Sequence, residues 1–197
     1  MPLRNTIRAM GSVAALVTLS VPTAAAGPFD DVTVSNDRTL AAFESVYIAP
    51  VQVDLPTDVR TNIRDINSPR AVTENDQTLR AERLQRDLSR AFDRHFTLAD
   101  GPGDGVLTVE TTVTGLRSTR PTLADAELNV QIDFSSIFAG GADYEAKISE
   151  NKTELVTITD SFQSSLNDGR PRIGVWQDAD RASRRFSDQL ARYVRNN

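Results

Sequence analysis

Hydrophobic and polar residues alternate along the second half of the chain, in the pattern typical of strands with one buried face. The alternation runs through residues 107–113 and returns at 128–138, 144–148 and 156–162. Two consecutive glycines, at 140–141, mark a turn between two of these stretches. Successive alternating strands with short connections favour an antiparallel meander.

An earlier stretch, residues 43–53, is rich in β-branched and aromatic residues and predicts a further strand. Pro50 within it cannot donate a ladder hydrogen bond, so we expect it at a sheet edge or a bulge. A polar connection follows at 54–73. Because loops of this length in compact domains are often functional, its arginine-bearing part, 57–70, is a candidate contact surface.

Two other stretches carry apolar residues three and four positions apart, which is typical of amphipathic helices. The first predicted helix covers residues 76–97 and the second covers 176–193. Trp176 is in phase with Phe186 and Leu190, so we expect its ring in the core rather than in a sugar-stacking site.

These elements together predict an α+β fold. We expect a two-layer sandwich in which an antiparallel sheet of roughly four to five strands is packed by the two helices. They form a single domain over residues 41–197. The preceding segment, 27–40, is polar and acidic with few large apolar groups, which predicts a flexible leader or a loosely docked extension.

The first 26 residues follow the pattern of a secretory signal. Two arginines precede the apolar run 10–21, which ends at the small-residue site Ala24-x-Ala26. We therefore predict cleavage near Ala26 and a periplasmic protein. The run is shorter than the roughly 20 apolar residues that span a bilayer, so we expect no transmembrane segment in the mature protein.

The net negative charge of the chain limits the classes of partner that we expect it to bind. Without the signal the chain carries 20 basic and 27 acidic residues, a formal charge of −7. This excess of acid argues against nucleic acid and against anionic lipid surfaces, since both bind clustered Lys and Arg. There is no cysteine, which excludes disulfides, thiolate nucleophiles, cysteine-type zinc sites and a lipid anchor on an N-terminal cysteine.

Lysine is nearly absent from the chain. The basic residues of the full sequence are 20 arginines and only 2 lysines, Lys147 and Lys152, a skew that indicates codon bias in a GC-rich genome. Residues 151–153 fit the glycosylation sequon, which in a bacterium is a chance match.

Candidate chemistry is sparse. His95 is the single histidine and falls late in the first predicted helix, where a structural role at the helix C-terminus is expected. The glycine-rich stretch 101–105 follows a helix and precedes a strand, whereas phosphate loops lie between a strand and a helix, so we interpret it as a turn. Acidic residues on the polar sheet face could form a catalytic pair or a cation site, although alternating acids on a wet face are ordinary. These acids are Glu110, Glu127, Asp133, Asp143 and Glu145. We assign no catalytic, cofactor-binding or metal-ligating residue, and we expect no cofactor.

Three segments and the tryptophan-led helix resemble a known family. The segments are the strand 46–53, the turn and strand 101–109, and the stretch 142–149 leading through Glu154 to Asp160. The chain resembles the uncharacterised bacterial envelope family catalogued as domain of unknown function 3313 (DUF3313). Members of that family are usually predicted lipoproteins, whereas this chain lacks the acceptor cysteine. The resemblance implies an envelope location and supplies no catalytic residues.

Three functional hypotheses follow. The leading one is an exported, non-enzymatic envelope protein that binds another envelope component, such as a protein partner, as an accessory part of an assembly. The second is a periplasmic hydrolase that uses paired carboxylates on carbohydrate, which requires two acids about 5–9.5 Å apart. The third is a carrier of a small ligand or cation that uses the same acidic face.

Overall fold

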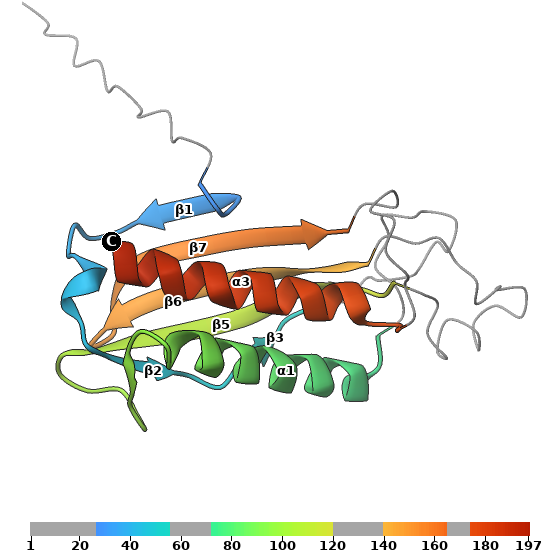
Figure 1. The fold of residues 1–197 in the computed structure, drawn as a ribbon, viewed down its shortest axis with the longest axis horizontal. Helices are drawn as coiled ribbons and strands as arrows, with labels where there is room; N and C mark the ends of the chain where they lie inside the picture. Colours follow the sequence, from blue (N-terminus) through green and yellow to red (C-terminus); the bar gives the residue numbers. More distant parts are fainter. Residues whose placement is uncertain (1–26, 56–71, 120–139, 165–173) are drawn as a thin grey trace, which may run out of the picture.

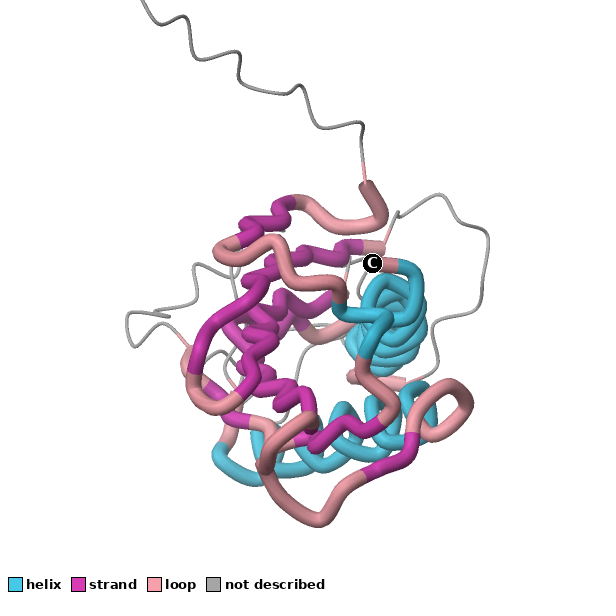
Figure 2. Tube along the Cα trace, turned by 90° about the vertical axis from the view of Figure 1, so that its left-hand side faces the viewer, coloured by secondary structure: helices cyan, strands magenta, loops and turns pink. Residues whose placement is uncertain are grey.

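The computed structural model describes residues 27–55, 72–119, 140–164 and 174–197. Two long helices pack on one face of a single sheet, which Figure 1 shows face-on and Figure 2 shows from the end. The predicted α+β class, with helices layered on a mostly antiparallel sheet, is therefore confirmed. The sheet has more strands than predicted, because it is 7-stranded.

The strands are β1 (Asp31–Val34), β2 (Ser45–Ile48), β3 (Gln52–Val53), β4 (Thr97–Leu98), β5 (Val106–Arg117), β6 (Gly141–Glu150) and β7 (Thr153–Gln163). The helices are α1 (Glu74–Phe92), α3 (Gln177–Asn196) and a short 3₁₀ helix, η1 (Leu40–Ala42). The strand order is β1-β7-β6-β5-β2-β4, and β3 also pairs with β5.

The sheet is mixed, which corrects the expectation of a purely antiparallel meander. The strands β5, β6, β7 and β1 pair antiparallel. In contrast, β2 and β3 run parallel to β5, and β4 runs parallel to β2. The physical reason is the helix α1, which lies between β3 and β5 in the chain and provides the crossover that parallel neighbours require.

Pro50 divides the predicted strand 43–53 into β2 and β3. The side chain of Gln85 on α1 bridges the break, because its Oε1 accepts a hydrogen bond from Val51 N at 2.9 Å and its Nε2 donates to the Ile48 carbonyl at 3.4 Å. The helix layer therefore supplies partners for two backbone groups beside the break, while Ala49 N still donates to the Val109 carbonyl of β5 at 3.0 Å.

The first predicted helix ends earlier than its pattern indicated. It begins with a capping box, in which Thr73 and Asp76 exchange side-chain and backbone hydrogen bonds, and it ends at Phe92. Residues 97–98, placed at or beyond the predicted helix end, belong to β4. His95 consequently lies after the helix, in an exposed turn.

Trp176 packs against the core from its edge and is not fully buried within it, which corrects a second expectation. It occupies the N-cap position of α3 and is half-buried, whereas Phe186 and Leu190 are fully buried on the same helix. The indole Nε1 donates to Asp76 Oδ1 at 3.0 Å. Helical phase alone placed the ring inward, but the polar indole group finds its partner at the rim of the helix layer.

The segment 27–40, expected to be a flexible leader or a loosely docked extension, contacts the domain through a strand and two buried side chains. β1 pairs with β7, and the buried ring of Phe29 contacts Phe186 and Tyr193 edge-on, at centroid distances of 6.1 and 5.8 Å. Leu40 is also buried. A short, polar segment can dock in this way because two large apolar side chains are enough to anchor it.

The core lies between the sheet and the two helices. Its largest fully buried side chains come from all layers and include Leu88 and Phe92 of α1, Phe186 and Leu190 of α3, and Ile148 of β6. The ring of Tyr144 stacks on Phe186 at 4.7 Å. No helix in the described ranges is long and apolar enough to cross a bilayer.

Some expectations fall outside the described residues. They are the signal peptide 1–26, the strand 128–138 with Glu127 and Asp133, and most of the polar connection, residues 56–71.

Candidate functional site

The face of the sheet opposite the helices is the strongest candidate surface. On β5, β6 and β7 every second side chain points away from the helix layer, and these residues are half-buried or exposed. No described element packs on this side, as the end view in Figure 2 indicates. We call this surface the open face. Its members are Thr108, Glu110, Thr112, Asp143, Glu145, Lys147, Ser149, Thr157, Thr159 and Ser161.

A groove of about 1120 Å³ runs over one part of the open face. Alternation along β5 and β6 supplies its floor, and the chain on either side of Pro50 supplies Tyr47 and Gln52. The loop before β5 and the β6–β7 turn also line it. The remaining polar floor residues are Thr108, Glu110, Thr112, Glu145, Lys147 and Ser149.

Charges in the groove are interleaved. Lys147 Nζ lies 3.1 Å from Glu145 Oε1, and Glu110 stands directly opposite Lys147 across β5 and β6. The hydrogen bond and charge of Glu145 raise the pKa of Lys147, so this amine stays protonated. The candidate acids Glu110 and Glu145 are therefore brought onto one surface, with an ammonium group beside them.

Asp143, the third described acid of the candidate set, is bound elsewhere on the open face. Arg117 holds it with both terminal nitrogens, Nη1 donating to Oδ2 at 2.6 Å, and Ser161 Oγ also donates to it. Burial alone raises the pKa of Asp143, but the hydrogen bonds from Arg117 and Ser161 outweigh it, so the pKa lies below its usual value. This arrangement requires glycine at 115, because a Cβ there would lie 2.2 Å from Asp143 Oδ2.

The glycine-rich stretch 101–105 forms a turn before β5, as predicted. Asp104 Oδ1 accepts a hydrogen bond from Asn151 Nδ2 at 2.9 Å, which ties this turn to the β6–β7 turn. Pro102 and Gly103 line the groove. The stretch therefore shapes the groove wall and makes no phosphate cradle, since no helix begins there.

His95 lies far from the groove, beyond the end of α1. The pKa of this exposed imidazole is lowered first by slight desolvation and then by the charges of Arg195, Arg94 and Arg192. Its Nδ1 is 3.5 Å from Arg195 Nη1. The imidazole is thus a neutral neighbour of arginines at the C-terminal ends of the two helices.

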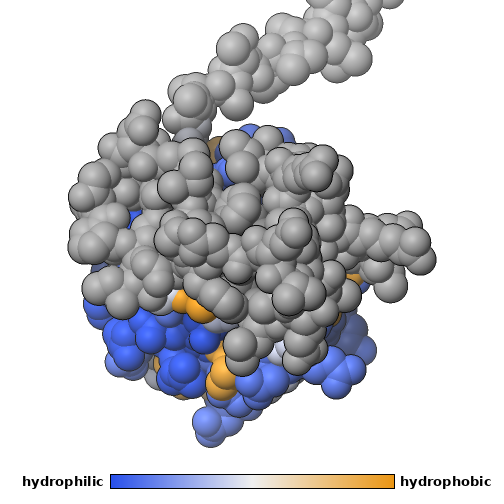
Figure 3. All heavy atoms as spheres, turned by 90° about the vertical axis from the view of Figure 1, so that its right-hand side faces the viewer, coloured by the Kyte–Doolittle hydropathy of each residue, from blue (hydrophilic) through white to orange (hydrophobic). Residues whose placement is uncertain are grey.

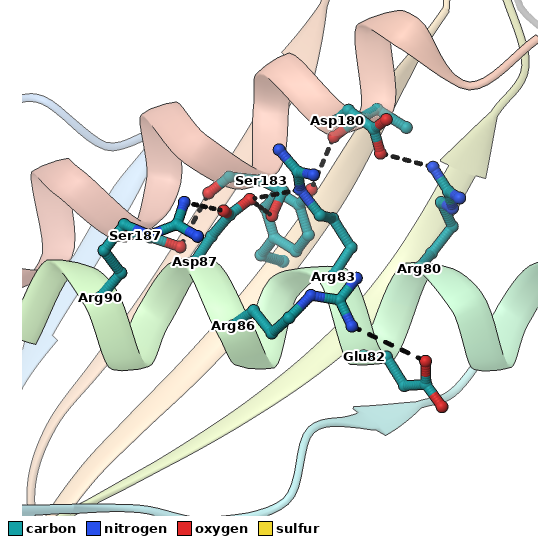
Figure 4. A network of polar contacts seen from close by, with 11 residues as sticks. Arg80, Glu82, Arg83, Arg86, Asp87, Arg90, Asp180, Ser183 and Ser187 are labelled. Carbon is teal, nitrogen blue, oxygen red and sulfur yellow. Dashed lines mark hydrogen bonds and ion pairs between the residues drawn. The ribbon is translucent and has the colours of Figure 1, made fainter.

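Polar groups also meet between the helices, where Asp87 of α1 is almost fully buried (Figure 4). Ser183 Oγ of α3 donates to Asp87 Oδ2 at 2.9 Å, and Arg83 Nε donates to the same oxygen at 3.1 Å. Arg80 pairs with Asp180 further along the interface. These contacts fix the packing of α1 on α3 and lie on the side of the molecule away from the groove.

Asp160 is a buried acid on β7, at a position that the alternation of the strand places on the inward face. It follows Val156 and Ile158 in the inward phase of β7, is 3% exposed, and neither carboxylate oxygen has a hydrogen-bond partner in the described ranges. Burial raises its pKa; Arg185 opposes the rise, and Asp30 and Asp143 add to it. It lines no part of the groove.

Exposed large hydrophobic residues do not gather into one patch. Within the described ranges they are Val34, Leu79 and Leu98, on β1, α1 and β4. At the end of the molecule seen in Figure 3, the described surface is mostly hydrophilic, with small separate hydrophobic spots. Among the surfaces described above, the groove is the one with a defined shape and a defined set of lining residues.

Comparisons with known proteins give a family and distant structural likenesses. A family model described as a protein of unknown function (DUF3313) matches residues 30–190. No curated protein matches the chain. The solved structures below share only 8–14% sequence identity with this chain, so they show a likeness in fold alone.

Among solved structures, the chain is similar to PelC from Paraburkholderia phytofirmans, described as a dodecamer, at 8% identity and a TM-score of 0.43 over 81% of this chain and 97% of that chain. It is similar to protein XCC0632 from Xanthomonas campestris at 13% identity and a TM-score of 0.42, over 78% of this chain and 83% of that chain. The hypothetical protein CT253 from Chlamydia trachomatis has 14% identity and a TM-score of 0.34, over 79% and 93% of the two chains.

Proposed function

We propose that this chain, which belongs to the DUF3313 family, is an exported, non-enzymatic protein of the cell envelope that binds another envelope component through the open face of its sheet. The observation that carries the proposal is the one-sided packing of the sheet. Both helices cover one face, and the other face carries polar side chains and a groove of about 1120 Å³.

Export is the second part of the proposal. It is supported by the charged start, apolar run and Ala24-x-Ala26 site of the first 26 residues. Expression of the full chain in a bacterial host, followed by cell fractionation and intact-mass measurement, tests it. The expected species is periplasmic and begins at Gly27, whereas an uncleaved cytoplasmic chain would contradict the proposal.

Binding through the open face is supported by the chemistry of that face. Its threonine and serine hydroxyls and its glutamates offer hydrogen-bonding groups at regular spacing along three adjacent strands. Two of the acids there are paired, Glu145 with Lys147 and Asp143 with Arg117, whereas Glu110 stands opposite Lys147 without a direct ion pair in the described ranges. A face of this composition suits recognition by many hydrogen bonds, as in other polar interfaces.

Site-specific photo-crosslinking in the native host tests the binding surface. A photoreactive amino acid is placed at Thr112, inside the groove, or at Thr159, on the open face outside it. The matched control is Arg86, an exposed position on α1. Adducts that form from Thr112 or Thr159 and not from Arg86 are expected. Adducts that form only from the helix position, or from none of the three, would overturn the open face as the surface that contacts a macromolecular partner.

A further inference from the structure

The turn between β6 and β7 has an unfavourable residue at its second position. Asn151 and Lys152 form a two-residue connection, and both have positive φ angles, of 47° and 68°. This is the conformation of a type I′ hairpin turn, in which glycine is the favoured second residue. A lysine held there has a conformational cost that glycine would avoid. Strained residues of this kind often cluster at binding sites.

Both lysines of the chain are in the groove. Among 22 basic residues only Lys147 and Lys152 are lysines, both line the groove, and none of the described arginines does. The ammonium group of Lys147 forms an ion pair with the Glu145 carboxylate. Lys152 is exposed and makes no ion pair with any residue in the described ranges. It is therefore the available cation of the groove.

The position of Lys152 is set by its neighbours. The Asn151 side chain donates to Asp104 and so links the turn to the loop that carries Pro102 and Gly103. The paired strands β6 and β7 fix the turn from the other side, with Glu150 opposite Thr153. The backbone at Lys152 is thus held at the groove, while its four-carbon stem leaves the ammonium free to reach a ligand.

The rest of the groove limits which anions fit. The carboxylates of Glu110, Glu145 and Glu154 repel a densely negative chain but accept hydrogen bonds from hydroxyl groups. The threonines of the floor can donate and accept, and Tyr47 adds a half-buried aromatic ring. The lining therefore suits a ligand with many hydroxyls and widely spaced negative charges.

We infer that the groove binds an acidic glycan, with a carboxylate or phosphate substituent on the Lys152 ammonium and sugar hydroxyls on the glutamates and threonines of the floor. The inference deepens the function proposed above and rests on it, because it assigns a ligand class to part of the same open face.

Nuclear magnetic resonance titration of the mature protein tests the ligand class. The probes are a disaccharide of glucuronic acid and N-acetylglucosamine, the neutral N-acetylglucosamine disaccharide, inorganic phosphate and a hexaglutamate peptide. Saturable shifts at the amides of Thr108, Lys147 and Asn151 are expected with the acidic disaccharide. The neutral disaccharide should bind about tenfold more weakly, the difference expected from one charge-assisted contact.

Substitution of Lys152 separates binding from stability. The variant Lys152→Gly should bind the acidic disaccharide about tenfold more weakly, yet its Tm should rise by about 2–4 °C because the turn strain is relieved. Lys152→Arg keeps the charge and should keep the affinity within about twofold. Arg86→Gln, which removes an exposed charge on α1, is the matched control and should leave the affinity unchanged.

Several outcomes would overturn the inference. Unchanged affinity in Lys152→Gly would remove Lys152 from the site. Hexaglutamate or phosphate binding as tightly as the disaccharide at the same amides would replace the glycan by an acidic peptide or a simple anion. If no sugar binds while open-face crosslinks persist, the glycan is wrong and the proposed function stands. If the sugar binds in the groove but no crosslink forms, the glycan inference stands and the proposed contact with a macromolecular partner is wrong.

Discussion

Trp176 and Asp76 join the beginnings of the two long helices across 100 residues of sequence: the indole Nε1 donates to Asp76 Oδ1 at 3.0 Å. The same carboxylate caps α1, since its Oδ2 accepts from the Thr73 backbone at 3.2 Å. Arg80 lies over the indole ring, 6.0 Å from its centroid. One acid therefore both starts α1 and holds it against the start of α3.

Replacing Asp76 by alanine should cost about 1–2 kcal/mol of unfolding free energy, because the cap and the interhelix hydrogen bond are lost together. Urea unfolding measures the loss. The chain has a single tryptophan, so its emission should also shift to longer wavelength as the indole loses its partner. Glu74→Ala is the control in the same helical turn and should cost only a few tenths of a kcal/mol. Equal losses in the two variants would refute the dual role of Asp76.

The buried contact between Asp87 and Ser183 should be the strongest polar link between the helices (Figure 4). Asp87→Ala should destabilise the protein by about 2–3 kcal/mol, since it leaves the Ser183 hydroxyl and Arg83 without their acceptor. Ser183→Ala should cost about 1 kcal/mol, and the double variant should show a coupling of at least about 0.5 kcal/mol. The exposed pair Glu82 and Arg86 is the control, and Glu82→Ala should stay within about 0.5 kcal/mol of wild type. Additive effects of the two buried substitutions would contradict the link.

Gly141 should tolerate no side chain. A Cβ there would lie 1.9 Å from the Phe162 carbonyl oxygen on the neighbouring strand, where backbone must move to make room. Gly141→Ala should therefore lower stability by about 3 kcal/mol. At Gly103 a Cβ would meet only the Val106 side chain, at 3.8 Å, so Gly103→Ala should change stability by less than about 0.5 kcal/mol. Thermal unfolding of both variants tests this difference. Similar Tm values for the two variants would show that the strands can move apart at Gly141 to admit a side chain.

Asp160 should make the protein more stable as the pH falls through the raised pKa of its carboxyl group. Its pKa is raised in the folded state, so the folded chain holds a proton more tightly than the unfolded chain does. Its contribution to stability is thus complete below the unfolded value of about 3.9 and is lost as the pH rises through the folded value. The charged or titratable groups facing it are Arg185 on α3, Asp30 ahead of β1, and Asp143 and Tyr144 on β6.

Asp160→Asn removes this dependence and should raise the unfolding free energy at pH 7 by about 1 kcal/mol. Urea unfolding at a series of pH values from 7 down to about 4 should show the variant more stable than wild type at pH 7, and the difference should shrink as the pH approaches the unfolded pKa of about 3.9. Asp143 has the opposite sign, because its lowered pKa adds stability above about pH 4 that is lost on further acidification. An Asp160→Asn protein less stable than wild type at pH 7 would show that the buried carboxylate has a favourable partner.

Phe29 should anchor the N-terminal strand. Phe29→Ala removes its edge-on contacts with Phe186 and Tyr193 and should cost about 3 kcal/mol, with faster amide exchange in β1 and the facing residues of β7. Val34, which is 55% exposed on the same strand, supplies the control, and Val34→Ala should have an effect below about 0.5 kcal/mol. Unchanged exchange rates in Phe29→Ala would mean that strand pairing alone holds β1.

Much of the fold could be predicted because its long elements carry their own periodicity. Residues 107–113, 144–148 and 156–162 fall within β5, β6 and β7, and most of the two helical stretches fall within α1 and α3. Each of these elements buries one face against the other layer, so the pattern of apolar residues records its conformation. The turn at 101–105 and the interruption at Pro50 follow from local backbone chemistry in the same way.

Other features have no local signature. Two-residue strands such as β3 and β4 are too short for any periodicity, and their parallel pairing depends on where α1 directs the chain. Trp176 has the helical phase of a core residue, but its N–H group meets Asp76 only once the helices are packed. Within the groove, the alternation places Glu110 and Glu145 on the open face, whereas the sequence distinguishes Lys152 only as one of two lysines. A two-residue Asn-Lys connection between alternating runs was the available signal for a hairpin turn.

The sequence by itself determined the class of fold, the inward and outward faces of the long strands and helices, and the absence of cysteine chemistry, because these depend on residue type and short-range spacing. Only the tertiary structure decided which strands are neighbours, that β1 is docked, and that both lysines share one groove. These properties join residues far apart in the chain, and their energies come from packing and pairing between elements, which no local pattern contains.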